Sequence, residues 1–299
     1  MPSGLYIQDE HFYDQTTIYD LLKGKGIPWS IYHHGMPQSM VLEHLWDKFD
    51  HYHRIDNFFA DAKGNADDFP AYAFIEPSYG GPDQNDQHPP TDIRKGEILI
   101  AKVYNALRAN EALWQSTLFI LLYDEHGGFY DHVVPPANAE PPDDNTQEFS
   151  FTQYGVRVPA ILISPWVAKG FISDVFDHTS LLKYVCDNWG LDAAALGSRT
   201  AKASTFMPAL ANKARADTPG VFDLAKLSDV KTVIPTKTNE FQDSLVSFSH
   251  FLETKMSHVE ELAAIGYRSL KSLDGALAQL SVAKDRFLLF LHHSQNGHL

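Results

Sequence analysis

The chain has 299 residues, with 24 lysines and arginines against 38 aspartates and glutamates, and its formal net charge is −14. This charge argues against a nucleic-acid partner, because contacts to phosphates need clustered cations. Hydrophobic residues make up 44% and charged residues 21% of the chain, which excludes a disordered polymer and predicts a packed core.

The single cysteine, Cys186, excludes an intramolecular disulfide and a cysteine-rich zinc module. The longest apolar runs, residues 117–123 and 158–164, are about a third of the roughly 20 residues that a membrane span needs, so we expect no transmembrane segment. The first fifteen residues contain no lysine or arginine. They therefore do not resemble a signal peptide, and the localisation stays open.

The first half of the chain predicts an alternation of helices and strands. Residues 18–25 have the spacing of a short helix, which threonines 16 and 17 can cap and Gly24 and Gly26 can end. Residues 27–32 predict a strand, and residues 43–62 predict one helix that stops before Gly64. Residues 71–76 predict a second strand. It opens into the polar loop SYGGPDQNDQHPP, whose length is typical of functional loops.

The middle of the chain repeats this alternation. Residues 93–113 predict a helix, followed by the continuous apolar run TLFILLYD. A continuous run is typical of a strand buried on both faces, as in a parallel sheet covered by helices. Residues 158–164 repeat the pattern, and residues 178–189 return to a helix. The order of these elements predicts an α/β layered sheet.

The composition changes at about residue 201, where short polar segments with prolines lead into helical patterns at 241–255, 258–270 and 275–293. We therefore expect an α/β domain over residues 1–200 and a mainly helical extension over 201–299. The amphipathic helices of the extension also allow an interaction module, although amphipathic stretches usually indicate packing.

The segment YDEHGGFYDH, residues 123–132, is the first candidate site. It places Asp124, Glu125 and His126 just after the most hydrophobic strand, and ligands of open α/β sheets lie outside the carboxyl ends of strands. Adjacent carboxylates repel each other unless a cation lies between them, so the pair indicates a divalent metal. Gly127 and Gly128 allow a sharp turn. The alternative is an ordinary strand-end turn that Asp124 caps.

Further histidines are candidates in weaker contexts. His88 lies in NDQHPP, where prolines restrict the backbone, but a lone loop histidine is more often a surface residue. His178 precedes a helix in FDHTS and indicates an anion site, whereas Asp177 or Thr179 as an ordinary N-cap is the alternative. His33 and His34 follow a predicted strand and are candidates for lining the same crevice.

Several enzyme classes lose support because their motifs are missing. The sequence contains no GxSxG elbow, no P-loop, no HExxH and no dinucleotide fingerprint. This disfavours a serine hydrolase of the elbow type, a P-loop nucleotidase and a Rossmann oxidoreductase.

The ordered segments of residues 16–189 resemble a known family. FIEPSYGGPDQNDQHPP, GEILIAKVYNALR, YDEHGGFYDHVVPP, YGVRVPAILISPW and FDHTS resemble, in this order, the C-terminal half of the phosphoesterase family. That family contains bacterial non-haemolytic phospholipases C and related acid phosphatases, with fungal members. TTIYDLLKGKGIPWSIY is similar to the region just ahead of these blocks.

The resemblance implies an alkaline-phosphatase-like α/β fold with helices on both faces of the sheet, and metal-dependent hydrolysis of phosphate esters or phospholipids. Asp124 and Glu125 match the carboxylate pair that holds the metal. His88 matches a histidine that contacts the phosphoryl group or transfers a proton. His126 and His178 lie in blocks that resemble metal-site elements of the superfamily. The relatives are usually exported.

These matches and the sequence patterns together assign a role to each candidate; for His33 and His34 the assignment rests only on their place after a predicted strand. The catalytic candidates are His88 and His126, the substrate-binding candidates are His178, His33 and His34, and the metal ligands are Asp124 and Glu125, which bind a divalent ion.

The chain also departs from the family pattern. Members begin with a glutamate-asparagine metal block and a Ser-Phe-Asp run, and later supply a serine or threonine nucleophile, whereas this chain starts downstream of both. The nearest substitutes, DNFFAD at Asp56 and the serines Ser39 and Ser78, lie in the wrong context. We therefore expect a truncated phosphoesterase with weak or absent activity on its own. The alternative is a non-catalytic protein that binds phosphate or a lipid headgroup.

Overall fold

The computed structural model describes residues 13–45, 47–80, 84–89, 91–143 and 150–227. The helices predicted at 241–255, 258–270 and 275–293 lie outside these residues, and so does most of the predicted C-terminal extension.

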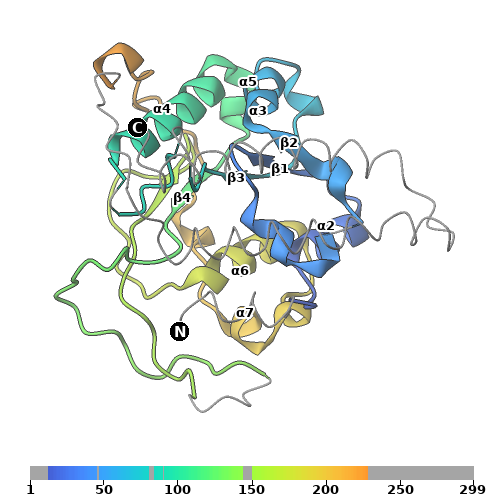
Figure 1. Cartoon of the computed structure of the whole chain (residues 1–299), viewed down its shortest axis with the longest axis vertical. Coiled ribbons are helices and arrows are strands. Elements are labelled where there is room, and N and C mark those ends of the chain that lie inside the picture. Colours follow the sequence, from blue (N-terminus) through green and yellow to red (C-terminus); the bar gives the residue numbers. More distant parts are fainter. Residues whose placement is uncertain (1–12, 46, 81–83, 90, 144–149, 228–299) are drawn as a thin grey trace, which may run out of the picture.

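A three-stranded parallel sheet forms the centre of the fold (Figure 1). Strand β1 (Trp29–His33) lies between β2 (Tyr52–Arg54) and β3 (Tyr72–Glu76). Its last residue, His33, pairs with Arg54 on one side and with Glu76 on the other. The carboxyl ends of all three strands therefore meet at one edge of the sheet, which is where α/β folds bind ligands.

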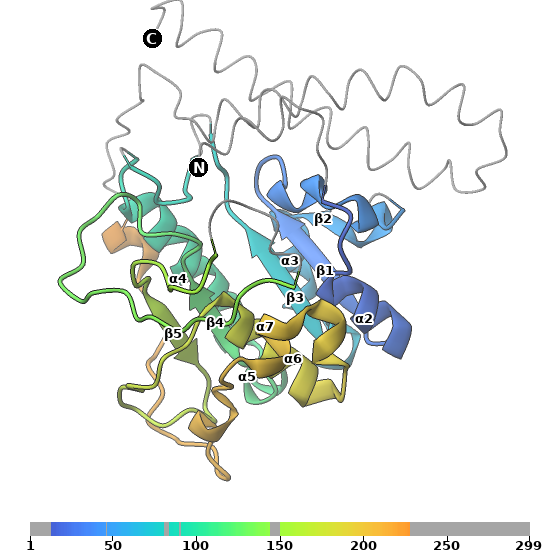
Figure 2. The same cartoon turned by 90° about the horizontal axis from the view of Figure 1, so that it is seen from below.

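Helices cover both faces of this sheet (Figures 1 and 2). Trp29 and Ile31 of β1 pack into one core cluster with α2 (Ile18–Lys25) and α6 (His178–Trp189). Tyr32, which points to the other face, packs into a second cluster with α3 (Ile55–Asp61), α4 (Arg94–Ala109) and α5 (Glu111–Gln115). Because β1 is buried on both faces, the layered α/β class predicted from the sequence is confirmed.

Helices α2 and α6 match their predicted bounds residue for residue. Thr17 caps α2 and forms a capping box with Asp20, and the left-handed Gly26, at a φ of 72°, ends the helix. Asp177 caps α6 through the backbone N–H groups of Thr179 and Ser180. Local side-chain hydrogen bonds therefore define both helices independently of the rest of the fold.

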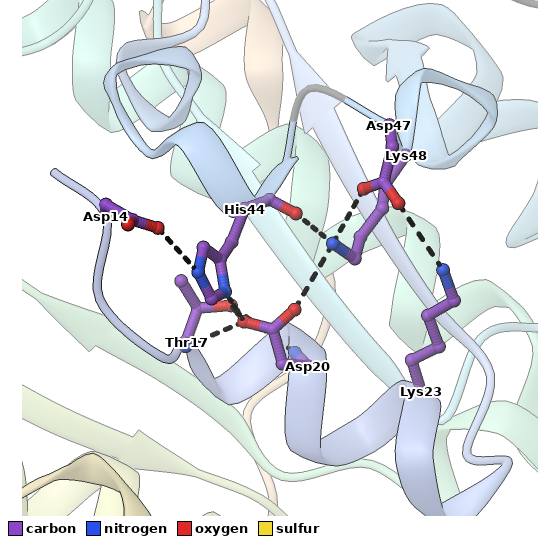
Figure 3. Close-up of polar contacts among 7 residues, drawn as sticks. All are labelled: Asp14, Thr17, Asp20, Lys23, His44, Asp47 and Lys48. Carbon is purple, nitrogen blue, oxygen red and sulfur yellow. Dashed lines mark hydrogen bonds and ion pairs between the residues drawn. The ribbon is translucent and has the colours of Figure 1, made fainter. Parts of the chain in front are cut away.

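A cluster of charged groups joins the first turn of α2 to residues 44–48 (Figure 3). The two ring nitrogens of His44 lie 2.9 Å from Asp20 Oδ2 and 2.8 Å from Asp14 Oδ1. Lys48 Nζ lies 3.2 Å from the other oxygen of Asp20 and 2.8 Å from Asp47 Oδ1. The four hydrogen bonds that Asp20 receives outweigh its burial and lower its pKa to about 2.

The single helix predicted over residues 43–62 is wrong. The chain forms short 3-10 turns at Glu43–Leu45 and Phe49–His51, then strand β2, and only then helix α3. Arg54 is extended, with φ −65° and ψ 150°, because the preceding residues pair with β1. Pairing with the sheet thus overrides a helical spacing of apolar residues.

Strands form within both predicted segments, residues 117–123 and 158–164, but the prediction that they are buried on both faces of a parallel sheet is wrong. Strands β4 (Phe119–Leu122) and β5 (Ala160–Ile163) form a separate antiparallel pair. Phe119 and Ile163 pack against the second core cluster, whereas Ile161 is 50% exposed. Every residue of β4 pairs with a residue of β5 in the antiparallel register, from Phe119 with Ile163 to Leu122 with Ala160.

The predicted helix over 93–113 is interrupted at Asn110, which has an extended backbone and caps α5. Its side-chain amide donates to the carbonyl oxygens of Ala62 and Gly64. The remaining elements are short: α7 (Ser198–Lys202) and 3-10 turns at Gln38–Val41, Ala66–Asp68, Ala193–Leu196, Met207–Ala209 and Leu224–Leu227. Of the helices in the described part of the chain, none has the length and apolar character to cross a membrane.

Candidate active site at the carboxyl edge of the sheet

A buried carboxylate, that of Glu76, lies where β1 and β3 end. Glu76 is 1% exposed and accepts hydrogen bonds from the N–H of Gln38 (2.5 Å), from the N–H and hydroxyl of Ser39 (3.2 and 2.5 Å), and from the Tyr79 hydroxyl (3.2 Å). Burial raises the pKa of Glu76, and these hydrogen bonds oppose the rise. Because Glu76 is the last residue of β3, its carboxylate connects the end of this strand to residues 38–39 and to Tyr79.

The two strand-end histidines have different environments. His33 is 1% exposed, and its Nδ1 lies 2.7 Å from the Gly35 carbonyl oxygen. Burial lowers its pKa to about 4, although the hydrogen bond to Gly35 opposes this. His34 is half-buried. Its backbone N–H donates to the Glu76 carbonyl at 3.0 Å, and its Nδ1 lies 2.8 Å from the amide nitrogen of Asn85.

The loop that carries Asn85 and His88 is held by its own polar groups and by α4. Asn85 exchanges two hydrogen bonds with the backbone of Ser78, at 2.9 and 2.7 Å. Burial raises the pKa of Asp86, and the hydrogen bonds from Gln84 and the His88 N–H oppose the rise. Gly96 of α4 faces this loop: a β-carbon there would overlap the Gln87 side chain and lie 3.0 Å from the Asn85 carbonyl oxygen. The loop therefore rests directly on the helix backbone.

The turn after β4 presents its two acids at the surface. Asp124 and Glu125 are exposed, and Glu125 Oε2 accepts the Gly127 N–H at 2.7 Å. Gly127 and Gly128 have φ values of 64° and 75°, a left-handed backbone that glycine adopts without strain. Among the described residues His126 Nδ1, which is buried, has no hydrogen-bond partner.

The structure brings the first two candidate segments together. His88 Nε2 lies 3.9 Å from Glu125 Oε1. Tyr79 lies close enough to both segments to be affected by their charges. Burial raises the pKa of Tyr79 well above its ordinary value, and the negative charges of Glu76, Asp124 and Asp86 raise it further. Acids and a histidine from separate segments therefore gather at the carboxyl edge of the sheet.

His178 joins this region through the main chain. Its Nε2 lies 2.9 Å from the Tyr123 carbonyl oxygen, so the ring donates a hydrogen bond to the end of β4. The backbone N–H groups of Thr179 and Ser180 are bonded to Asp177, as the N-cap alternative predicts. An anion at this helix end would have to displace the Asp177 carboxylate.

The described residues do not complete a metal site, since they contain no group of three or more histidine, cysteine or acidic side chains placed to hold an ion. Asp124 and Glu125 alone do not satisfy the six or more oxygen ligands that Ca²⁺ takes or the octahedron of Mg²⁺.

Three residues of the region, Glu76, Tyr79 and Asn85, are not among the candidates that the sequence indicates. An acid directly after an apolar strand was a usable signal for Glu76. Tyr79 and Asn85 carry no local signal, because their roles depend on contacts with residues far apart in the sequence.

Comparison with known proteins places the chain in a family. The model of the phosphoesterase family matches residues 6–192. The chain is 32% identical over 272 residues to non-specific phospholipase C6 of Arabidopsis thaliana, an alignment that covers 81% of this chain and 52% of the relative. Non-specific phospholipase C1 of the same plant is 32% identical over 269 residues, covering 79% and 48%.

A bacterial relative is similar over a shorter range. Phospholipase C B of Mycobacterium tuberculosis is 30% identical over 197 residues, 57% of this chain and 36% of the relative. The chain thus spans about half the length, or less, of the curated relatives it matches. Because the family match covers more than half of the chain and includes β1, β3, β4 and α6, the chain belongs to the phosphoesterase family.

Proposed function

We propose that this chain takes part in the hydrolysis of phosphate esters as a phosphoesterase of the phospholipase C type, with a divalent metal held in part by Asp124 and Glu125. The observation that carries the proposal is the approach of His88 to Glu125, 3.9 Å apart, from two different loops at the carboxyl edge of the sheet. Relatives named phospholipase C support a phospholipid as the substrate.

The histidines have separate roles in this proposal. His88 Nδ1 lies 2.7 Å from the Pro89 carbonyl oxygen and so carries a proton, which leaves Nε2, the atom that faces Glu125, to exchange a proton or contact the phosphoryl group. His126 has a buried Nδ1 without a partner among the described residues, which supports a role in binding or proton transfer, because such a nitrogen costs stability. His178, His33 and His34 line or support the edge that receives the phosphate.

The metal would require more ligands than the described residues supply. Asp124 and Glu125 are two oxygen donors on one exposed turn, and water or donors outside the described residues would have to complete the set. When bound, a divalent ion would neutralise charge on a phosphoryl group.

A second candidate function is the binding of phosphate or a lipid headgroup without turnover. It is favoured by the state of the two serines that could substitute for a nucleophile. Ser39 donates its hydroxyl to the buried Glu76, and Ser78 donates its hydroxyl to the Gly80 carbonyl at 2.9 Å. Both hydroxyls are therefore engaged in hydrogen bonds within the fold.

The test is an assay of the full chain on an aryl phosphate and on phosphatidylcholine vesicles, with Mg²⁺, Mn²⁺, Ca²⁺ or Zn²⁺ added. We expect Asp124→Asn and Glu125→Gln to lower metal-dependent turnover by about a hundredfold or more. Asp56→Asn, an exposed acid on α3, is the matched control and leaves turnover unchanged. The ratio of the rate on the aryl phosphate to the rate on phosphatidylcholine separates monoesterase from diesterase activity.

Two other outcomes are informative. Metal-dependent binding of inorganic phosphate that Asp124→Asn abolishes, without turnover in any variant, would establish the second candidate. Turnover that neither acid substitution affects would reject the site.

A further inference from the structure

We propose that Asn85 is a positioning residue that locks His34 as the neutral tautomer with its proton on Nε2, so that His34 serves as a hydrogen-bond donor to an anionic phosphate oxygen. The inference rests on the proposed function for its ligand, whereas the tautomer follows from the geometry alone.

The orientation of the Asn85 side-chain amide is determined by the backbone of Ser78. The Ser78 N–H lies 2.7 Å from Asn85 Oδ1, and a backbone N–H only donates, so this end of the amide must be the oxygen. The backbone N–H of Asn85 donates in turn to the Ser78 carbonyl at 2.9 Å. Asn85 is also buried, with 9% of its surface exposed. The amide oxygen is therefore fixed by the Ser78 N–H, and the backbone hydrogen bond holds Asn85 beside Ser78.

The opposite end of the amide determines the state of His34. The Asn85 NH₂ group lies 2.8 Å from His34 Nδ1, and an amide nitrogen donates but does not accept. His34 Nδ1 must therefore accept, which requires it to be unprotonated. In a neutral imidazole the proton is then on Nε2.

The backbone holds His34 in place from the other side. Its N–H donates to the Glu76 carbonyl at 3.0 Å, directly after the β1–β3 pairing of His33 with Glu76. The ring thus lies between the end of the sheet and the loop that carries Asp86 and His88. A neutral N–H donor in this place adds no charge that would have to be desolvated.

The neighbouring histidines have the opposite arrangement. His33 Nδ1 lies 2.7 Å from the Gly35 carbonyl oxygen and His88 Nδ1 lies 2.7 Å from the Pro89 carbonyl oxygen. A carbonyl accepts only, so both of these rings carry a proton on Nδ1. Of the three, His34 alone has its Nδ1 paired with a donor. The two tautomers therefore differ: Nε2 of His88, which faces Glu125, is the unprotonated nitrogen of a neutral ring, whereas Nε2 of His34 carries the proton.

The decisive measurement is the imidazole ¹⁵N spectrum of the full chain, labelled at histidine, with His34 assigned by the loss of its signals in His34→Gln. We expect Nδ1 of His34 to resonate as an unprotonated nitrogen and Nε2 as a protonated one. In Asn85→Asp, one carboxylate oxygen still accepts from Ser78 while the other faces His34. The proton then moves to Nδ1, or the ring becomes doubly protonated with a raised pKa. A protonated Nδ1 in the wild type, or an averaged mixture of tautomers, would overturn the proposal.

Binding of inorganic phosphate tests the donor role. We expect His34→Gln and Asn85→Ala each to weaken the phosphate Kd by about tenfold, and the double variant to be no weaker than His34→Gln, because Asn85 acts through His34. Additive losses would reject that coupling. If the wild type binds no phosphate, the proposed function and the donor role both fail, while the ¹⁵N spectrum still decides the tautomer. Unfolding midpoints of each variant show that the comparison is made between folded proteins.

Discussion

Gly127 lies directly against Pro89. A β-carbon on Gly127 would be 3.3 Å from Pro89 Cδ and 3.2 Å from the Phe129 ring, and the backbone at Gly127 is left-handed. This contact joins the turn that carries Asp124 and Glu125 to the loop that carries His88. The spacing between the two candidate loops therefore depends on the absence of a side chain at position 127.

We expect Gly127→Ala to lower the free energy of unfolding by about 1–2 kcal/mol for the left-handed backbone, and in addition to separate the two loops. Gly128→Ala is the matched control, since its backbone is also left-handed but nothing lies within 4 Å of a β-carbon there. Urea unfolding measures the first effect, and phosphate or metal affinity measures the second. Equal affinities in the two variants would show that the loop contact does not shape the site.

Glu76→Gln is expected to destabilise the fold by about 1–3 kcal/mol. One carboxylate oxygen accepts from the Ser39 N–H and the other from the Gln38 N–H, so the new amide nitrogen must face a backbone donor in either orientation. Glu111→Gln, at an exposed side chain, is the control and changes stability by less than about 0.5 kcal/mol. Denaturant unfolding distinguishes them; similar losses would mean that Glu76 is not a structural acceptor.

The cluster around His44 predicts a dependence of stability on pH. Hydrogen bonds to Asp20 and then Asp14 raise the pKa of His44. Its contribution is therefore complete below the ordinary value of about 6.5 and is lost as the pH rises through the raised pKa. Asp20, with a pKa of about 2, contributes above its unfolded value of about 4 and loses this contribution as the pH falls toward 2.

The cluster should thus stabilise the fold most between about pH 4 and 6.5. We expect His44→Gln to cost no more than about 1 kcal/mol at pH 5.5, because a partly exposed ion pair is screened, and less at pH 8.5. His132→Gln, at a side chain that is 82% exposed, is the control. A loss that is the same at both pH values would contradict the assignment of charge to His44.

Removing the N-cap of α6 tests how the helix is attached to β4. Asp177→Ala should cost about 1 kcal/mol, whereas Asp177→Asn, which retains an acceptor, should cost little. Because His178 donates to the Tyr123 carbonyl, fraying of this first turn should also speed amide hydrogen exchange near the end of β4. Unchanged exchange there would show that the helix end and the strand end are independent.

The helices whose bounds were predicted correctly are those whose ends are determined by residues close in sequence. Thr17 and Gly26 bound α2, and Asp177 bounds α6, through hydrogen bonds to residues within the same helix turn. The predictions failed where distant parts of the chain decide. Residues 52–54 became a strand because β1 offers them a parallel partner, and β4 turned out antiparallel because residues 160–163 return beside it.

The same distinction between local and long-range contacts applies to the residues of the candidate site. Asp124, Glu125 and His88 could be proposed because acids after a strand and a histidine in a long polar loop are visible in the sequence. Their approach to each other depends on tertiary contacts such as that between Gly127 and Pro89. Asn85 was missed because its two partners, Ser78 and His34, belong to different strand ends.

The contact of the polar loop with Gly96 allows the position of this loop to be changed by one substitution. A methyl group at position 96 would press on Gln87 and on the Asn85 carbonyl, and would lift the loop from α4 without removing any charge or polar side chain. Gly96→Ala is consequently a way to change the position of His88 relative to the acids after β4 through packing alone. The position of the loop can thus be changed separately from the charged and polar side chains at the edge of the sheet.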